Sequence, residues 1–148
     1  PSICEAPNLR QLSFGSIDYA LDVGCSESRD ALLLARLSLV TQARARGLPS
    51  PIDGVTVSVI DDDLIRSDAD YAKHLGFGGK LAIHPNQVGI IKASLYPSKE
   101  ELAWAQTICT LQDHSKGGTV LLEGCMVDTP VIERARRILN QAGGVEPV

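Results

Sequence analysis

The feature that most constrains the fold is an alternation of extended and helical segments over the first 95 residues. Short β-branched or apolar segments, which indicate strands, lie at residues 9–14, 54–60 and 80–84. Segments with apolar residues at helical spacing follow them, at residues 30–46, 67–75 and 85–95. Such an alternation with short connections is typical of parallel strands joined by right-handed crossovers. The sequence therefore predicts an α/β fold with about three β/α units.

The last third of the chain departs from this alternation. Ser98 and Glu101 match a capping box that starts a helix, and Pro130 suits the first turn of a final helix. Between these helices, residues 120–122 form a short extended piece and residues 123–129 are expected to form a loop. This helical segment has no strand partner of its own, so we expect it to cover another part of the protein.

The length of 148 residues limits the architecture. Three strands cannot close an eight-stranded β/α barrel, which needs at least about 200 residues. We therefore consider either a small open α/β sheet or the final part of a larger barrel. In the second case, residues 1–95 are a partial β/α barrel and residues 96–148 are a C-terminal helical lid or oligomerisation segment.

Composition excludes several classes of partner and location. A net charge of −4 argues against a nucleic-acid or membrane-surface partner. The longest apolar run, residues 31–35, is far too short to span a bilayer, and Glu5 and Pro7 interrupt the region where a signal peptide would be apolar. The four cysteines show neither CxxC nor metal-ligand spacing. We expect a cytoplasmic protein with reduced thiols.

Chemically capable side chains follow each expected strand. Asp18 lies just beyond the first strand, three residues after Gly15. The acidic triplet of residues 61–63 follows the second strand, and His84 ends the third strand. The carboxyl ends of parallel strands share one edge of a sheet, where α/β folds place their active sites. Carboxylates at such an edge suit a hard cation such as Mg²⁺. Asp128, in the loop of the last third, is a further candidate.

Each candidate also has a structural interpretation. Asp18 is suited to capping a helix that begins near Tyr19. The acidic triplet, residues 61–63, is typical of a solvated turn or of the start of a helix. His84 fits equally well as a packed strand-end histidine. Asp128, two residues before Pro130, is in place to cap the final helix.

Five segments occur together in an order and spacing that resemble one known family. They are LSFGSID at residues 12–18, IDGV at 52–55, LGFGGKLAIHPNQ at 75–87, YPS at 96–98 and GCMVDTP at 124–130. In these segments the chain resembles the C-terminal half of the citrate lyase β-subunit-like branch of the HpcH/HpaI aldolase superfamily. The resemblance covers nearly all of the chain.

The resemblance implies a fold and a reaction. The family's members are (β/α)8 TIM barrels with an added C-terminal helical segment, and are commonly homo-trimers or homo-hexamers. They are Mg²⁺-dependent lyases that cleave or form a carbon–carbon bond next to a thioester. Their substrates are 3-hydroxyacyl-CoA esters of the malyl, citramalyl or citryl type, so coenzyme A belongs to the substrate.

The resemblance also implies roles for individual residues. Asp18 corresponds to one of two carboxylate ligands of Mg²⁺. Backbone N–H groups around Gly15 and Ser16 face the small carboxylic-acid half of the substrate. Asp128 lies on the lid, often that of a neighbouring subunit, and acts as the catalytic acid or base. His84 is a possible substrate contact.

The chain also departs from the family pattern. The family's second metal ligand, a glutamate, and its substrate-binding arginine lie on earlier strands, which would precede Pro1. We therefore expect the 148-residue chain alone to be inactive. Two alternatives remain open, namely a non-catalytic binding or assembly module and a pyruvate-type class II aldolase, which acts on free acids. The GCMVDTP segment, residues 124–130, weighs against the second.

Overall fold

The computed structural model describes residues 6–114, 120–122 and 125–143. The chain divides into two compact units, Pro1–Leu95 and Tyr96–Val148. Separate clusters of buried apolar side chains lie in each of them. Each unit is therefore described by itself.

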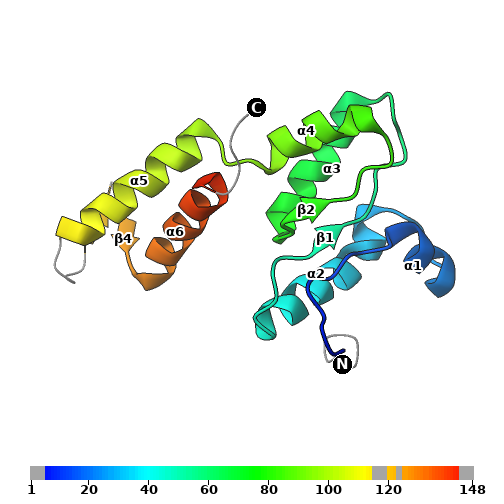
Figure 1. Ribbon diagram of the computed structural model, residues 1–148, viewed down its shortest axis with the longest axis horizontal. Helices are drawn as coiled ribbons and strands as arrows, with labels where there is room; N and C mark the ends of the chain where they lie inside the picture. Colours follow the sequence, from blue (N-terminus) through cyan, green and yellow to red (C-terminus); the bar gives the residue numbers. More distant parts are fainter. Residues whose placement is uncertain (1–5, 115–119, 123–124, 144–148) are drawn as a thin grey trace. The chain divides into compact units, whose positions relative to one another are not determined.

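The first unit is built on short parallel strands. Strand β1 (Ile52–Asp53) pairs in parallel with β2 (Gly79–Lys80), and Figure 1 shows the two strands side by side. On the other side of β1, Ser13 forms an isolated parallel bridge with Ile52. The N–H of Ile52 donates to the Leu12 carbonyl at 2.9 Å, which fixes this register. The prediction of parallel β/α units is confirmed, but the strands are shorter than predicted.

Four helices lie in the described part of this unit, residues 6–95. They are α1 (Ser16–Val23), α2 (Arg29–Ala45), α3 (Asp62–Leu75) and α4 (Pro85–Leu95). The limits of α2 and α4 agree with the prediction to within one residue. The Ser28 hydroxyl accepts from the Ala31 N–H and starts α2, while Gly76, at φ 97°, ends α3 in the left-handed conformation that glycine favours.

The predicted strand at residues 54–60 is wrong, because side chains satisfy the backbone there. The Gln87 amide donates to the carbonyls of Thr56 and Ser58 at 2.8 and 2.9 Å, and Lys80 Nζ donates to the Gly54 carbonyl at 2.7 Å. These carbonyls therefore need no neighbouring strand. Burial is also uneven among the β-branched residues of this segment, since Thr56 is 3% exposed whereas Val57 is 63% and Ile60 89% exposed.

Two helices differ from the sequence prediction. Helix α1 occupies a region where no separate helix is predicted except in the capping interpretation of Asp18. Helix α3 begins at Asp62, five residues before the predicted start at Ser67, because the Asp61 carboxylate accepts from the Leu64 N–H at 2.9 Å. The acidic triplet is thus the start of a helix.

The second unit is a helical pair with a small hairpin. It contains α5 (Lys99–His114), β3 (Val120–Leu122), β4 (Cys125–Val127) and α6 (Thr129–Gly143). The predicted capping box is confirmed, since the Ser98 N–H donates to Glu101 and the Glu101 N–H donates to the Ser98 hydroxyl. Strand β4 pairs antiparallel with β3, so the predicted loop is wrong at residues 125–127, while residues 123–124 lie outside the described residues.

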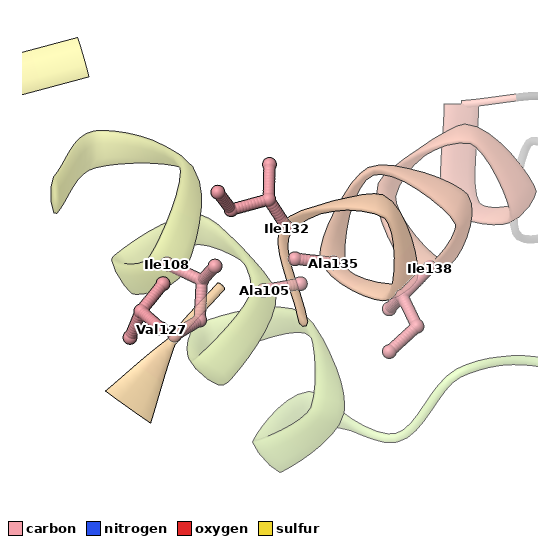
Figure 2. Close-up of a cluster of buried hydrophobic side chains, with 6 residues drawn as sticks. All are labelled: Ala105, Ile108, Val127, Ile132, Ala135 and Ile138. Carbon is pink, nitrogen blue, oxygen red and sulfur yellow. The ribbon is translucent and has the colours of Figure 1, made fainter. Parts of the chain in front are cut away.

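Apolar side chains from α5, β4 and α6 form one core in this unit. Figure 2 shows how they meet between the two helices: Ala105, Ile108, Val127, Ile132, Ala135 and Ile138. The residues of α6 in this cluster follow the helical spacing of the sequence. None of the described helices is long and apolar enough to cross a bilayer.

Candidate functional site

The turn that leads into α1 holds three of the predicted site residues. Gly15 precedes α1 directly, and Asp18 lies in the first turn of that helix with its side chain exposed. A Cβ atom placed on Gly15 would lie 3.4 Å from Asp18 Oδ2, so the carboxylate folds back over the glycine. Within the described part of the chain, the Asp18 carboxylate forms neither an ion pair nor a side-chain hydrogen bond.

Asp18 does not cap α1. The N-cap is Gly15, and this helix start carries no side-chain cap hydrogen bond. The capping interpretation is therefore wrong: α1 begins at Ser16 and not near Tyr19, so Asp18 lies in the first helical turn. A negative charge in that turn is favoured by the positive end of the helix dipole.

Ser16 joins this turn to the end of β1. Its side chain is buried, and a Cβ atom placed on Gly54 would lie only 2.2 Å from the Ser16 Oγ and 3.1 Å from the Phe14 carbonyl oxygen. Only a glycine leaves room for this approach. The structure thus brings together Gly15, Ser16 and Asp18 at the carboxyl end of the first extended segment.

His84 lies elsewhere in the same unit, next to the start of α4. Its side chain is exposed, so the packed strand-end interpretation is wrong. Its Nδ1 accepts from the Asn86 N–H at 3.2 Å, and its carbonyl accepts from the Gln87 N–H at 3.0 Å. These hydrogen bonds are local to the beginning of α4, so a substrate contact stays a prediction.

Asp128 belongs to the second unit and is exposed. Its Oδ1 accepts from the Val131 N–H at 3.2 Å, and its carbonyl accepts from the Ile132 N–H. The structural interpretation, that Asp128 caps the final helix, is confirmed. A catalytic role for the same carboxylate stays a prediction.

Metal-binding side chains do not gather into a larger cluster among the described residues. Mg²⁺ takes oxygen ligands in octahedral geometry and is commonly held by one or two carboxylates together with substrate and water. No group of three or more His, Cys, Asp or Glu side chains that could hold a metal occurs among the residues that the structure describes. Asp18 can supply one ligand, and further ligands would have to come from other residues or the substrate.

A buried charged cluster next to this turn was not predicted from the sequence. Asp53, whose side chain is 1% exposed, accepts from Arg36 Nε at 2.9 Å and lies 3.7 Å from Lys80 Nζ. Burial lowers the pKa of Lys80 from its ordinary 10.5, against the opposing effect of Asp53. The sequence signal for this pair was weak, because Asp53 directly precedes the strand predicted at residues 54–60 and Lys80 begins the one predicted at 80–84.

The cluster borders a cavity of about 160 Å³. Its walls come from α1, α2, α3, β1 and the segments before α2 and after β1. The charged and polar side chains among the lining residues are Ser16, Glu27, Arg29, Arg36, Asp53, Thr56, Ser58, Asp68 and Tyr71. Arg29 Nη2 pairs with Asp68 at 2.9 Å and lies over the ring of Tyr71. This cavity reaches the predicted turn through Ser16.

Comparison with known proteins identifies the chain's relatives. The sequence profile of the HpcH/HpaI aldolase/citrate lyase family matches residues 1–85. The mitochondrial citramalyl-CoA lyase of Rattus norvegicus is 30% identical over 138 residues, which are 90% of this chain and 40% of that protein. A citrate lyase subunit beta-like protein of Deinococcus radiodurans is 32% identical over 143 residues, covering 93% of this chain and 50% of the relative.

Solved structures agree with these matches. The CitE protein of Mycobacterium tuberculosis, in complex with magnesium, acetoacetate and coenzyme A, is 30% identical, with a TM-score of 0.82 over 95% of this chain and 55% of that one. A citrate lyase from Burkholderia xenovorans shares the fold at 22% identity, with a TM-score of 0.81 over 97% of this chain and 48% of that one.

The chain spans about half the length of the curated relatives it matches. The family profile nevertheless covers more than half of this chain. The resemblance seen in the sequence is therefore confirmed, and the chain belongs to the HpcH/HpaI aldolase/citrate lyase family.

Proposed function

We propose that this chain is the C-terminal part of a Mg²⁺-dependent carbon–carbon lyase that acts on a 3-hydroxyacyl-CoA ester. The observation that carries the proposal is the similarity, along 95% of the chain, to a CitE protein in complex with magnesium, acetoacetate and coenzyme A. The match to citramalyl-CoA lyase supports the same class of substrate. In this proposal residues 1–95 contribute about three β/α units to a TIM barrel.

The turn at the start of α1 is the proposed substrate and metal site. Asp18 has an exposed carboxylate that no described side chain occupies, so it is free to supply one ligand to Mg²⁺. Gly15 and Ser16 precede it at the positive end of the helix, where backbone N–H groups favour a carboxylate. These two residues would therefore orient the small carboxylic-acid half of the substrate.

The second unit is the proposed lid and oligomerisation segment. Asp128 would transfer a proton to or from the carbon next to the thioester, in a site from which the lid excludes water. His84, exposed beside α4, would contact the substrate. The complete protein would act as a trimer or hexamer. It would be cytoplasmic, although the rat relative is mitochondrial, and cell fractionation tests that assignment.

The proposal predicts a specific loss on substitution of Asp18 in the complete protein. Asp18→Asn keeps the shape of the side chain and removes the charge that a cation needs. We expect the rate of Mg²⁺-dependent cleavage of citramalyl-CoA or malyl-CoA to fall by at least about 100-fold. Mutation of residues that only hydrogen-bond to metal ligands already lowers metal affinity or activity by roughly 10–100-fold. The measurement is release of the free acid and the CoA thioester at varied Mg²⁺.

The matched control is Asp22→Asn, one turn further along α1 and also exposed, which should keep full activity. Normal cleavage by the Asp18 variant would contradict the metal assignment. A free hydroxy-acid substrate, cleaved as well as its CoA ester, would favour the pyruvate-type aldolase instead. A complete protein with neither activity would leave the binding or assembly module as the better description.

A further inference from the structure

A buried hydrogen-bond donor lies at the wall of the cavity between α2 and α3. Arg36 is 7% exposed, and its Nε is paired with Asp53. Its Nη1 is fully buried and has no acceptor among the residues that the structure describes. A buried guanidinium N–H without a partner costs more than an ordinary missing hydrogen bond, because the group is charged. Arg36 also lines the cavity, so an acceptor that enters it would approach this guanidinium group.

The charges around Arg36 also do not balance. The side chains of Lys80 and Asp53 are each 1% exposed. The positive charges of Arg36 and Lys80 both lie against the single carboxylate of Asp53. Lys80 donates its short hydrogen bond to the Gly54 carbonyl, at 2.7 Å, and not to a second carboxylate. Two buried positive charges thus face one buried negative charge. A further negative charge in the cavity would offset this excess.

The other acidic groups of the wall do not supply that charge. Asp68 is already engaged, because Oδ1 pairs with Arg29 and Oδ2 accepts from the Thr56 hydroxyl at 2.9 Å. Glu27 is exposed, where solvent screens its charge. Arg36 itself lines the cavity, and the hydroxyl groups of the wall, such as Ser58, supply further donors.

We propose that this cavity binds one small oxyanion, a carboxylate or inorganic phosphate, at the Arg36 guanidinium. The cavity of about 160 Å³ accommodates such an ion, since a water molecule takes about 30 Å³ of liquid volume. Oxyanion oxygens match the planar fork of a guanidinium group. The site does not depend on the proposed lyase reaction.

Titration of the 148-residue chain with defined anions tests this proposal. Sodium acetate and sodium phosphate are each added at constant ionic strength, with chloride as the replacement, and binding is followed by calorimetry and by the free energy of unfolding. We expect saturable binding of at least one oxyanion, and stabilisation that grows with the logarithm of its concentration above the dissociation constant. The anion that saturates the site at the lower concentration, acetate or phosphate, shows whether the site prefers a carboxylate or a phosphate.

Variants locate the site. Arg36→Lys keeps a cation beside Asp53 but removes the planar guanidinium fork, and should weaken oxyanion binding at least tenfold. Arg44→Lys, exposed in the last turn of the same helix, is the matched control and should bind like the parent. Equal oxyanion binding by the parent and the Arg36 variant would overturn the proposal. So would titrations in which acetate and phosphate have no saturable effect that chloride lacks, because water would then fill the cavity.

A second pair of variants tests the site without changing Arg36, in case the Arg36 variant does not fold. Val55 lines the cavity without taking part in the charged cluster, so Val55→Phe should fill the space and abolish oxyanion binding while Arg36 and Asp53 remain paired. Val88, 55% exposed and outside the wall, provides the control Val88→Phe, which should bind normally. Binding that survives in the folded Val55 variant would contradict the proposal.

Discussion

A single glycine after β1 decides whether the turn at α1 can form. A Cβ atom on Gly54 would lie 2.2 Å from Ser16 Oγ and 2.8 Å from Ser16 Cβ, inside the van der Waals distance. We predict that Gly54→Ala lowers the free energy of unfolding by about 1–3 kcal/mol, the usual effect of overpacking. Urea denaturation measures it.

Two further variants show whether the clash with Ser16 is the cause. Ser16→Ala added to Gly54→Ala should recover part of the loss, because it removes the closest atom. Gly89→Ala, where a Cβ would meet nothing within 4 Å, should stabilise by about 0.5–1 kcal/mol, since α4 then gains a better helix former. Additive effects of the Ser16 and Gly54 substitutions would contradict this explanation.

Lys80 gives the first unit a characteristic response to alkaline pH. Burial lowers the pKa of Lys80 in the folded state below 10.5, its unfolded value. Between these two pKa values the unfolded chain binds more protons, so stability should rise with pH and level off above about 10.5.

The measurement is urea denaturation of the parent and of Lys80→Met from neutral pH upward. The variant should lack this rise, so the difference in the free energy of unfolding between parent and variant should change with pH. Lys92→Met, exposed on α4, is the control and should keep the slope of the parent. Identical slopes for all three proteins would show that the buried ammonium does not titrate differently on folding.

At the scale of elements, helices were better predicted than strands. Helix α2 has apolar spacing, an N-cap serine and a glycine beyond its end, all of which are local signals. Strands β1 and β2 are two residues long and are defined by partners far along the chain, such as Gly79 opposite Ile52. A segment of that length has too few residues to show a periodicity of two.

The residue that caps helix α6 has two separable roles, one structural and one proposed. Asp128 accepts from the Val131 N–H and is also the proposed acid or base. Asparagine caps helices as well as aspartate does but cannot transfer the proton. We therefore predict that Asp128→Asn in the complete protein lowers kcat by about 100-fold or more at unchanged stability. Asp128→Ala should also lose about 1 kcal/mol of stability.

Steady-state kinetics and urea denaturation of the two variants separate these roles. The control is Glu133→Gln, which changes an exposed carboxylate one turn into α6 and should leave both kcat and stability unchanged. Full activity of the Asp128→Asn variant would leave helix capping as the role of this residue.

At the scale of the whole molecule, the two units have separate cores. The core of the second unit contains Ile138, while Ile65, fully buried, belongs to a cluster of the first. We predict that Ile138→Ala destabilises the second unit by about 2–5 kcal/mol, because it leaves a cavity. Hydrogen exchange should show faster exchange in α5 and α6 and unchanged exchange in α2 and α3.

Ile65→Ala is the reciprocal variant. It should accelerate exchange in α3 and α4 and leave α5 and α6 protected, because its cluster draws on the first two of these helices. Faster exchange throughout the chain in both variants would instead show that the two units unfold as one cooperative body.

The sequence alone determined the order of β/α units, the limits of α2 and α4, the capping box at Ser98 and the family, because these depend on local spacing or on contiguous motifs. Only the tertiary structure decided that Gln87 replaces a strand partner and that Arg36, Asp53 and Lys80 form a buried cluster. Those contacts join residues far apart in the chain. Their energies depend on burial, which no local pattern records.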